Sequence, residues 1–380
     1  MRAVFALEFL NAKEHLAPGG AFPARGGTPA QLLMPSGIQR LSRDLDFVGI
    51  GTNEEFEAIL DRIAAHYGGQ LFTWKERVLS SPRLPMHAYE VAFPTPAGPT
   101  QTLVLDVVPI AVTLPYARLP LNRSSTYRPL DPNDAVLTLS ADAFIADKLP
   151  TLGFDTHGYP RPTEALSYEG HPEHIWKQIH DLAGLRHLPI DLGVVHQGYV
   201  AGIAARNVAR GLALSPAACL ADAWRVCDIA VAALNGYPAD DLNDAHYLWD
   251  VLHVRAGINT YAQYAIGRWT PTARLRSAAQ VSFLVAALRE IEEGELTPVD
   301  VNAVAARVGE VQARLASLQR KDPLHQRFVA RRNGIAWGWA IESSFVYRLA
   351  PEAALYLLVA GDLVGHAKHL SAEGAFAFEA

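Results

Sequence analysis

Arg25-Gly26-Gly27-Thr28 is followed, after one expected helix, by Arg40-Leu41-Ser42-Arg43-Asp44-Leu45-Asp46-Phe47. A turn built on two glycines lacks Cβ atoms, so its backbone N–H groups can approach a phosphate, and the N-terminus of the next helix favours anions. Residues two apart in a strand face the same side, so Asp44 and Asp46 present two carboxylates together. Such a pair is costly without a cation, and Mg²⁺ suits it because Mg²⁺ takes few protein carboxylates together with phosphate oxygens and water.

A third acid stands alone in a later strand. Asp106 is the single acidic residue of the apolar run Leu103–Val108. A lone carboxylate there needs a partner, and a role as third metal-side acid or as general base would supply one. Each piece also has a plain structural interpretation: a common glycine turn, a solvated strand face and a capped strand end. Their order along the chain favours the functional interpretation.

That order resembles the DNA polymerase β superfamily of nucleotidyltransferases, in which a GG or GS turn, a DxD pair and a third Asp follow one another. More narrowly, residues from about 20 to 185 resemble the AbiEii/AbiGii nucleotidyltransferase toxin family, whose pattern reads approximately KGGTxL and then RxSxDhDh. Arg25 stands at the lysine of that pattern. Ala146-Asp147-Lys148-Leu149 is similar to its AxKL helix. Lys177-Gln178-Ile179-His180-Asp181-Leu182 is similar to its RDxxDL helix, with Lys-Gln at the Arg-Asp pair.

The resemblance implies a metal-dependent nucleotidyltransferase that moves an NMP from an NTP to an acceptor and releases pyrophosphate. Two Mg²⁺ ions would be held by Asp44, Asp46 and Asp106, and Asp106 would help to deprotonate the acceptor hydroxyl. The remaining implied site residues are Gly26, Gly27 and Thr28 around the phosphates, Ser42 as a donor beside the acid pair, and Lys148 and Asp181 on the nucleotide or the acceptor. The implied acceptor is RNA, specifically a tRNA 3′ end, and the implied biology is that of a toxin with a cognate antitoxin or of phage defence.

Alternatives stay open at this stage. Lys148 is equally well an ordinary solvated lysine, and Lys177 with Asp181 forms a possible i,i+4 surface pair. The same chemistry could act on a small molecule or a protein side chain, and the chain could instead be a non-catalytic module that binds a nucleotide or a partner. A basic cleft would favour RNA, and its candidate side chains are Arg25, Arg40, Arg43, Lys75, Arg77, Arg123 and Arg128.

Length, composition and charge indicate the class of protein and its domain organisation. The chain has 380 residues, 50% of them hydrophobic, and a net charge of −6, which favours two globular domains and argues against broad electrostatic coating of DNA. We expect an α+β protein: a small mixed-sheet nucleotidyltransferase core over residues 1–135, then a mainly helical lobe over 136–380. Residues 110–135 are expected to be a long connection. Valines and leucines spaced 3-4-3-4-3 from Val301 to Leu318 predict a helix with a packing seam.

The cysteines, the histidines and the N-terminal residues bear on the compartment of the protein and on further metal sites. Cys219 and Cys227 are interpreted as buried apolar residues, which fits a reducing cytoplasm. Glu8, Lys13 and Glu14 interrupt the apolar N-terminus before a signal sequence can form, and no segment is long enough to span a membrane. We therefore expect a soluble cytoplasmic protein. Five histidines between His171 and His196 lack metal-ligand spacing, and Trp337, Trp339, Phe345 and Tyr347 are expected to pack in a core.

Overall fold

The computed structural model of the chain describes most of its length. The described residues are 2–18, 22–42, 44–49, 51–69, 71–77, 86–95, 98–108, 114–158, 173–235, 245–264, 269–317 and 351–379. The chain divides into two compact units. The first comprises Met1–Asp147, Ala204–Ala213 and Tyr264–Arg268, and the second comprises Lys148–Ile203, Leu214–Gln263 and Trp269–Ala380. The expected domain boundary at residue 135 lies before the end of the first unit, because a strand and most of a helix beyond it still belong to that unit. The expected division of function between core and lobe stays a prediction.

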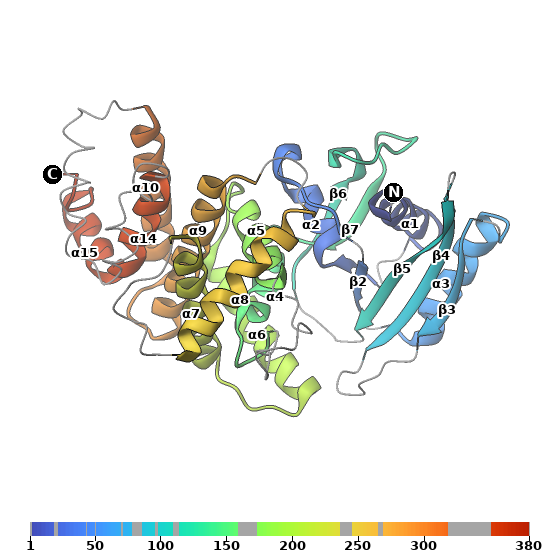
Figure 1. The fold of residues 1–380 in the computed structure, drawn as a ribbon, viewed down its shortest axis with the longest axis horizontal. Coiled ribbons are helices and arrows are strands. Elements are labelled where there is room, and N and C mark those ends of the chain that lie inside the picture. The colour runs from blue at the N-terminus through green and yellow to red at the C-terminus, as the bar shows by residue number, and fades with distance from the viewer. Residues whose placement is uncertain are drawn as a thin grey trace. The chain divides into compact units, whose positions relative to one another are not determined.

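The first unit is a mixed sheet with helices (Figure 1). Its helices are α1 (Arg2–Leu16), α2 (Gly27–Leu33), α3 (Asn53–His66) and α4 (Ala141–Lys148). Its strands are β1 (Ala24–Arg25), β2 (Asp44–Val48), β3 (Thr73–Arg77), β4 (His87–Thr95), β5 (Gly98–Val108), β6 (Tyr116–Pro120) and β7 (Ala135–Leu139). Short 3-10 turns cover Ser36–Ile38 and Leu121–Arg123.

The sheet has the strand order β3-β4-β5-β2-β1-β7-β6. The pairs β2–β5 and β1–β7 are parallel and the other neighbours are antiparallel. Alternation along β2 and β5 divides the two faces of the sheet. Leu45, Phe47, Leu103 and Leu105 are fully buried, and Phe47 meets aromatic rings from α1 and α3. These two helices therefore cover one face, and the acids of β2 and β5 lie on the opposite face.

Most expected elements of this unit are confirmed. Thr52 caps α3 through a capping box with Glu55, as the sequence predicts. The strand-like run of residues 70–74 predicts a strand at those positions, and the structure places β3 at Thr73–Arg77 instead. The expected long connection over 110–135 was wrong, because β6 lies within it and pairs antiparallel with β7. Strand β6 ends the strand order and finishes at Pro120. An edge strand tolerates a proline that breaks the alternation by which strands are identified.

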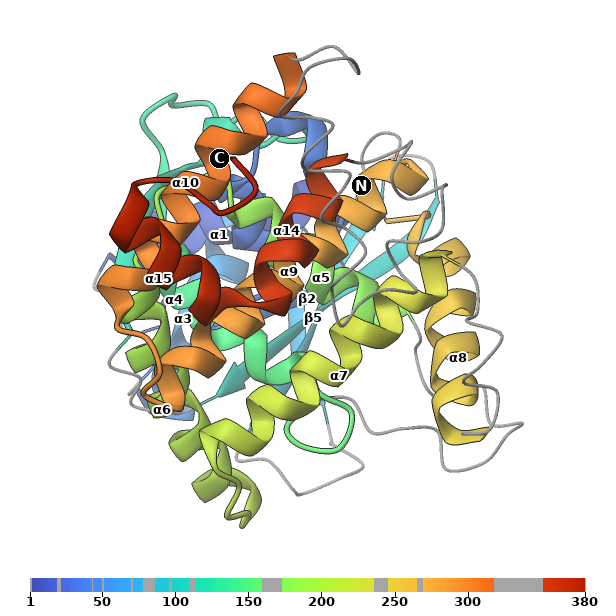
Figure 2. The ribbon, with the colours of Figure 1, turned by 90° about the vertical axis from the view of Figure 1, so that its left-hand side faces the viewer.

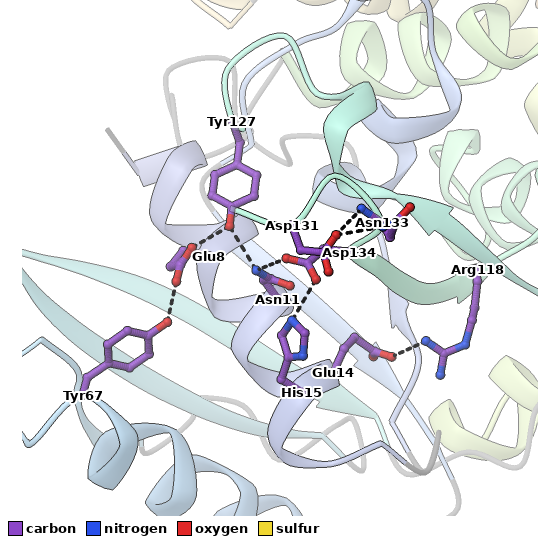
Figure 3. A network of polar contacts seen from close by, with 10 residues as sticks. All are labelled: Glu8, Asn11, Glu14, His15, Tyr67, Arg118, Tyr127, Asp131, Asn133 and Asp134. Carbon is purple, nitrogen blue, oxygen red and sulfur yellow. Dashed lines mark hydrogen bonds and ion pairs between the residues drawn. The ribbon is translucent and has the colours of Figure 1, made fainter. Parts of the chain in front are cut away.

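Polar contacts tie α1 to the rest of the first unit (Figure 3). The Glu8 carboxylate accepts hydrogen bonds from Tyr67 and Tyr127, each at 2.5 Å. The Asn11 amide donates to Asp134 at 3.0 Å. Two further pairs are His15 with Asp134 at 2.9 Å and Glu14 with Arg118 at 3.4 Å. Two of the residues that interrupt the apolar N-terminus thus join α1 to the sheet domain.

The second unit is helical. It contains the 3-10 turn Leu149–Leu152, α5 (Glu173–Leu185), most of α6 (Leu192–Arg210), α7 (Pro216–Asn235), α8 (Ala245–Tyr261), α9 (Pro271–Glu292), α10 (Pro298–Ser317), α14 (Pro351–Gly361) and α15 (Leu363–Glu373). Helices α10, α14 and α15 lie side by side (Figure 2). Val301, Val304, Val308, Val311 and Leu315 are all buried on α10, so the expected seam packs within the chain. Leu318 lies outside the described residues.

The expected fold class, a mixed-sheet core followed by a mainly helical lobe, is confirmed. Cys219 and Cys227 are buried and unbridged, as expected. The four aromatic residues between 337 and 347, together with His171 and Arg43, lie outside the described residues. Within the described part of the chain, no helix combines the length and apolarity required to cross a membrane.

Candidate active site

Three carboxylates occupy adjacent positions on one face of the sheet. Asp46 of β2 and Asp106 of β5 are directly paired in the parallel register, and Asp44 lies two residues before Asp46. All three therefore project from the face opposite the aromatic core. Burial raises the pKa of Asp106, and the nearby negative charge of Asp44 raises it further. Asp106 lies inside β5 and not at its end, so its interpretation as a capped strand end was wrong.

The glycine turn lies against this acid group. Gly26 adopts φ +77°, in the left-handed region that favours glycine, and α2 starts at the next residue. A Cβ atom built on Gly26 would overlap the carboxylate of Asp46. A Cβ atom on Gly27 would lie 2.8 Å from the Ser42 hydroxyl. The two glycines therefore allow the turn to approach the acid strand more closely than any other residue would.

Hydroxyl groups fix the acid strand from the same side. Ser42 donates a hydrogen bond from Oγ to the Asp44 carboxylate at 2.7 Å, as expected of a donor beside the acid pair. Thr28 donates from Oγ1 to the backbone carbonyl of Asp44 at 2.9 Å, and Thr28 is only 5% exposed. The Thr28 hydroxyl thus holds α2 to β2, a structural role that the sequence did not suggest. Its expected contact with phosphate stays a prediction.

The contact between Gly26 and Asp46 has a direct test in Gly26→Ala, with Gly68→Ala as its matched control. Gly68 has φ +65° and open space around its Cα, so its replacement adds backbone strain alone, about 1 kcal/mol or somewhat more. Gly26→Ala adds the same strain and also displaces the Asp46 carboxylate. We expect Gly26→Ala to lower the nucleotide transfer that the family resemblance implies at least about tenfold more than Gly68→Ala, as measured by the initial rate with labelled NTP. Equal rates for the two variants would show that the turn does not shape the acid group.

The acid group suits Mg²⁺ through its donors. Within the residues that the structure describes, no three His, Cys, Asp or Glu side chains enclose a metal position by themselves. Mg²⁺ does not require such an enclosure, since it binds through one or two carboxylates and completes its shell with substrate phosphates and water. Asp44 and Asp46 supply two oxygen donors on one face, and the Gly26 turn lies close against the Asp46 carboxylate. The residues present therefore fit the ion.

Lys148 and Asp181 form a buried ion pair in the second unit. Lys148 Nζ lies 2.8 Å from Asp181 Oδ2, and the two side chains are 8% and 0% exposed. Lys148 Nζ also donates to the Gln178 amide oxygen at 3.4 Å. The interpretations of Lys148 as a solvated lysine and of Asp181 as half of a surface pair were therefore wrong. The two AbiEii-like motifs that contain these residues are joined by this contact.

Another charged group was missed at the sequence level. Asp147 Oδ1 lies 3.3 Å from the Arg25 guanidinium and 3.1 Å from that of Arg206. Asp147 belongs to the AxKL-like motif, so the motif marked its neighbourhood. Arg206 lies on α6, outside every quoted motif, and no local pattern could have identified it.

Comparison of the sequence with models of known protein families identifies a family for part of the chain. Residues 25–213 match the family model described as nucleotidyl transferase AbiEii toxin, type IV toxin–antitoxin system. Residues 25–213 belong to the AbiEii family. The matched residues run from the end of β1 through α6 and contain every residue of the candidate site. The expected resemblance and the expected enzyme class, a nucleotidyltransferase, are confirmed.

Other comparisons add little. MenT4, a nucleotidyltransferase toxin from Mycobacterium tuberculosis H37Rv, is 14% identical in sequence, with a TM-score of 0.39 over 76% of this chain and 95% of its own. No curated protein matches the chain. The AbiEii assignment thus rests on the family model, whose description as a toxin of a type IV toxin–antitoxin system applies to residues 25–213.

Proposed function

We propose that this AbiEii protein transfers an NMP from an NTP to the 3′ end of tRNA, using Mg²⁺ held by the acid group. The observation that carries the proposal is the pairing of Asp46 with Asp106 across β2 and β5, with Asp44 on the same face. Three carboxylates at adjacent positions of a sheet are unfavourable unless they bind cations. When bound, two Mg²⁺ ions stabilise the attacking and leaving oxygens of an in-line phosphoryl displacement.

Each site residue has a defined part in the proposal. Asp44 and Asp46 would bind the metal, and Asp106 would complete the coordination of a second ion and accept the proton of the acceptor hydroxyl. Burial raises the pKa of Asp106 above its ordinary value, which makes this carboxylate a stronger base than an exposed aspartate. Ser42 orients Asp44 through its hydrogen bond. Gly26 and Gly27 give the phosphates access to the backbone, Thr28 supports that turn, and Lys148 with Asp181 binds nucleotide or acceptor.

The choice of RNA as acceptor comes from the family resemblance, as do the cognate antitoxin and the role in phage defence. The basic side chains considered for RNA differ in their availability. Lys75 is 72% exposed although it pairs with Glu90, and Arg77 is exposed on the edge strand β3. Arg40 is 6% exposed and donates to a backbone carbonyl. Exposed Lys75 and Arg77, which come from the same sheet as the acid group, are therefore the better contacts for an RNA backbone.

The test is nucleotide transfer by the purified protein. The full chain is incubated with Mg²⁺, each α-labelled NTP in turn, and total tRNA, and the products are separated by size. We expect label on tRNA from at least one NTP, and loss of that label when Mg²⁺ is chelated. Protein-dependent release of pyrophosphate with a cell extract but not with tRNA would move the acceptor to a small molecule or a protein. No transfer and no pyrophosphate release under any condition would favour a non-catalytic binding module.

A further inference from the structure

Arg206, Asp147 and Arg25 form a chain of contacts within the first unit. Arg206 donates from one guanidinium nitrogen to both the backbone carbonyl of Asp147, at 2.8 Å, and its side-chain oxygen Oδ1, at 3.1 Å. The same Oδ1 accepts a hydrogen bond from Arg25 at 3.3 Å. One carboxylate oxygen therefore joins two guanidinium groups that come from β1 and α6.

The chain of contacts is largely shielded from solvent. The side chains of Arg25, Asp147 and Arg206 are each less than one-fifth exposed. Burial lowers the pKa of Arg206, and the charge of Asp147 opposes that shift. Charge-assisted hydrogen bonds are stronger where water is excluded, so Arg206 holds Asp147 in a defined orientation through two such contacts. Two arginines and one aspartate leave one positive charge in excess.

That excess charge lies next to the acid group. Arg25 is paired with Asp46 in the antiparallel register of β1 and β2, so the two side chains leave the sheet on the same face. Arg25 also directly precedes Gly26 of the turn that is proposed to bind the phosphates. Its positive charge acts on Asp106 as well, two strands away.

Arg25 faces two competing partners. Opposite charges directly across an antiparallel pair attract, so an unrestrained Arg25 would pair with Asp46 and reduce its ability to bind a cation. Asp147 supplies another carboxylate and draws the guanidinium toward α4. Arg25 therefore stays beside the acid strand with its guanidinium group held at Asp147.

We propose that Arg206 is a positioning residue, which holds Arg25 through Asp147 so that Arg25 contacts the triphosphate of the bound NTP. The inference rests on the proposed function and deepens it, because it assigns the cation that meets the substrate's phosphates beside the Gly26 turn. Arg25 is the residue in contact with substrate. Asp147 and Arg206 act only through it.

A double-mutant cycle between Arg25 and Arg206 tests the proposal. The variants are Arg25→Met, Arg206→Met, Arg206→Lys and the Arg25→Met/Arg206→Met double variant of the full chain. Initial rates are measured against NTP concentration at saturating tRNA, and equilibrium dialysis with labelled NTP and Mg²⁺ measures binding without turnover. A lost charge-assisted hydrogen bond to phosphate predicts a KM and a Kd for NTP raised about tenfold to a hundredfold in Arg206→Met.

Two results separate positioning from general damage. Arg206→Lys should restore much of the NTP affinity, because an ammonium group can also reach a carbonyl and a carboxylate oxygen. The double variant should bind NTP no more weakly than Arg25→Met alone, because Arg206 has no effect once Arg25 is gone. Arg62→Met removes an arginine that bonds only backbone carbonyls on exposed α3, and it should leave both constants unchanged.

The remaining outcomes overturn the proposal. Additive losses in the double variant would mean that Arg206 acts on its own or on the fold, as would an unchanged Kd in Arg206→Met. Absence of transfer by the wild-type protein would overturn the proposed function alone, provided that NTP still binds and that the binding cycle is non-additive. A wild-type protein that neither transfers nor binds NTP would overturn both.

Discussion

Asp44→Asn and Asp46→Asn are each expected to lower the rate of nucleotide transfer by about a thousandfold or more. Metal-ion stabilisation of the transition state contributes several kcal/mol, and each 1.36 kcal/mol changes the rate tenfold. Asparagine keeps the shape of the side chain and one oxygen but removes the negative charge that binds the cation. The measurement is the initial rate of labelled NMP incorporation, at several Mg²⁺ concentrations.

The same variants should fold normally. Asp44 is exposed, and an asparagine there can still accept the hydrogen bond from Ser42. We expect their unfolding free energies to stay within about 0.5 kcal/mol of the wild type, or to rise as charge repulsion near Asp106 is relieved. Glu76→Gln is the matched control, since Glu76 is a largely exposed carboxylate on β3 of the same sheet. Retention of full activity by either aspartate variant would remove the acid group from the mechanism.

The sequence was informative about the acid group because its geometry is local. Asp44 and Asp46 share a face by strand periodicity alone, and the glycine turn needed only two adjacent residues. The contribution of Asp106 depends on which strand pairs with β2. That strand is β5, which is separated from β2 in the sequence by β3 and β4, so local periodicity cannot identify the pairing. The order of motifs in a known family supplied that long-range information.

Long-range polar partners were the part that periodicity could not predict. Lys148 and Asp181 are separated by 33 positions, and each alone has the pattern of a surface residue on a helix. Arg206 reaches Asp147 from a helix whose sequence carries no motif. Strand β6 was missed for a different reason, because an edge strand ending in proline lacks the clean alternation of a buried strand.

The buried pair of Lys148 and Asp181 leads to the largest expected effect on stability. Asp181→Ala removes one charge and leaves the Lys148 ammonium group with the Gln178 amide as its neighbour at 3.4 Å. Breaking a buried ion pair in this way costs about 3–5 kcal/mol, because the remaining charge is neither solvated nor neutralised. We expect a loss of this size in the unfolding free energy, measured by urea denaturation of the full chain.

An exposed pair of similar length provides the control. Lys75 and Glu90 lie 2.9 Å apart, but Lys75 is 72% exposed, so Lys75→Met should cost less than about 1 kcal/mol. Similar losses for Lys75→Met and Asp181→Ala would contradict the role given to burial.

Stability and function separate in the double variant Lys148→Met/Asp181→Leu. Replacing both members of a buried ion pair by apolar residues of similar size is often neutral or stabilising, so we expect this variant to be nearly as stable as the wild type. If the pair binds nucleotide or acceptor, the same protein should transfer nucleotide at least about a hundredfold more slowly, because two charge-assisted contacts are gone. A stable double variant with wild-type transfer would make the pair purely structural. This variant therefore measures the contribution of the pair to stability and its contribution to transfer in one protein.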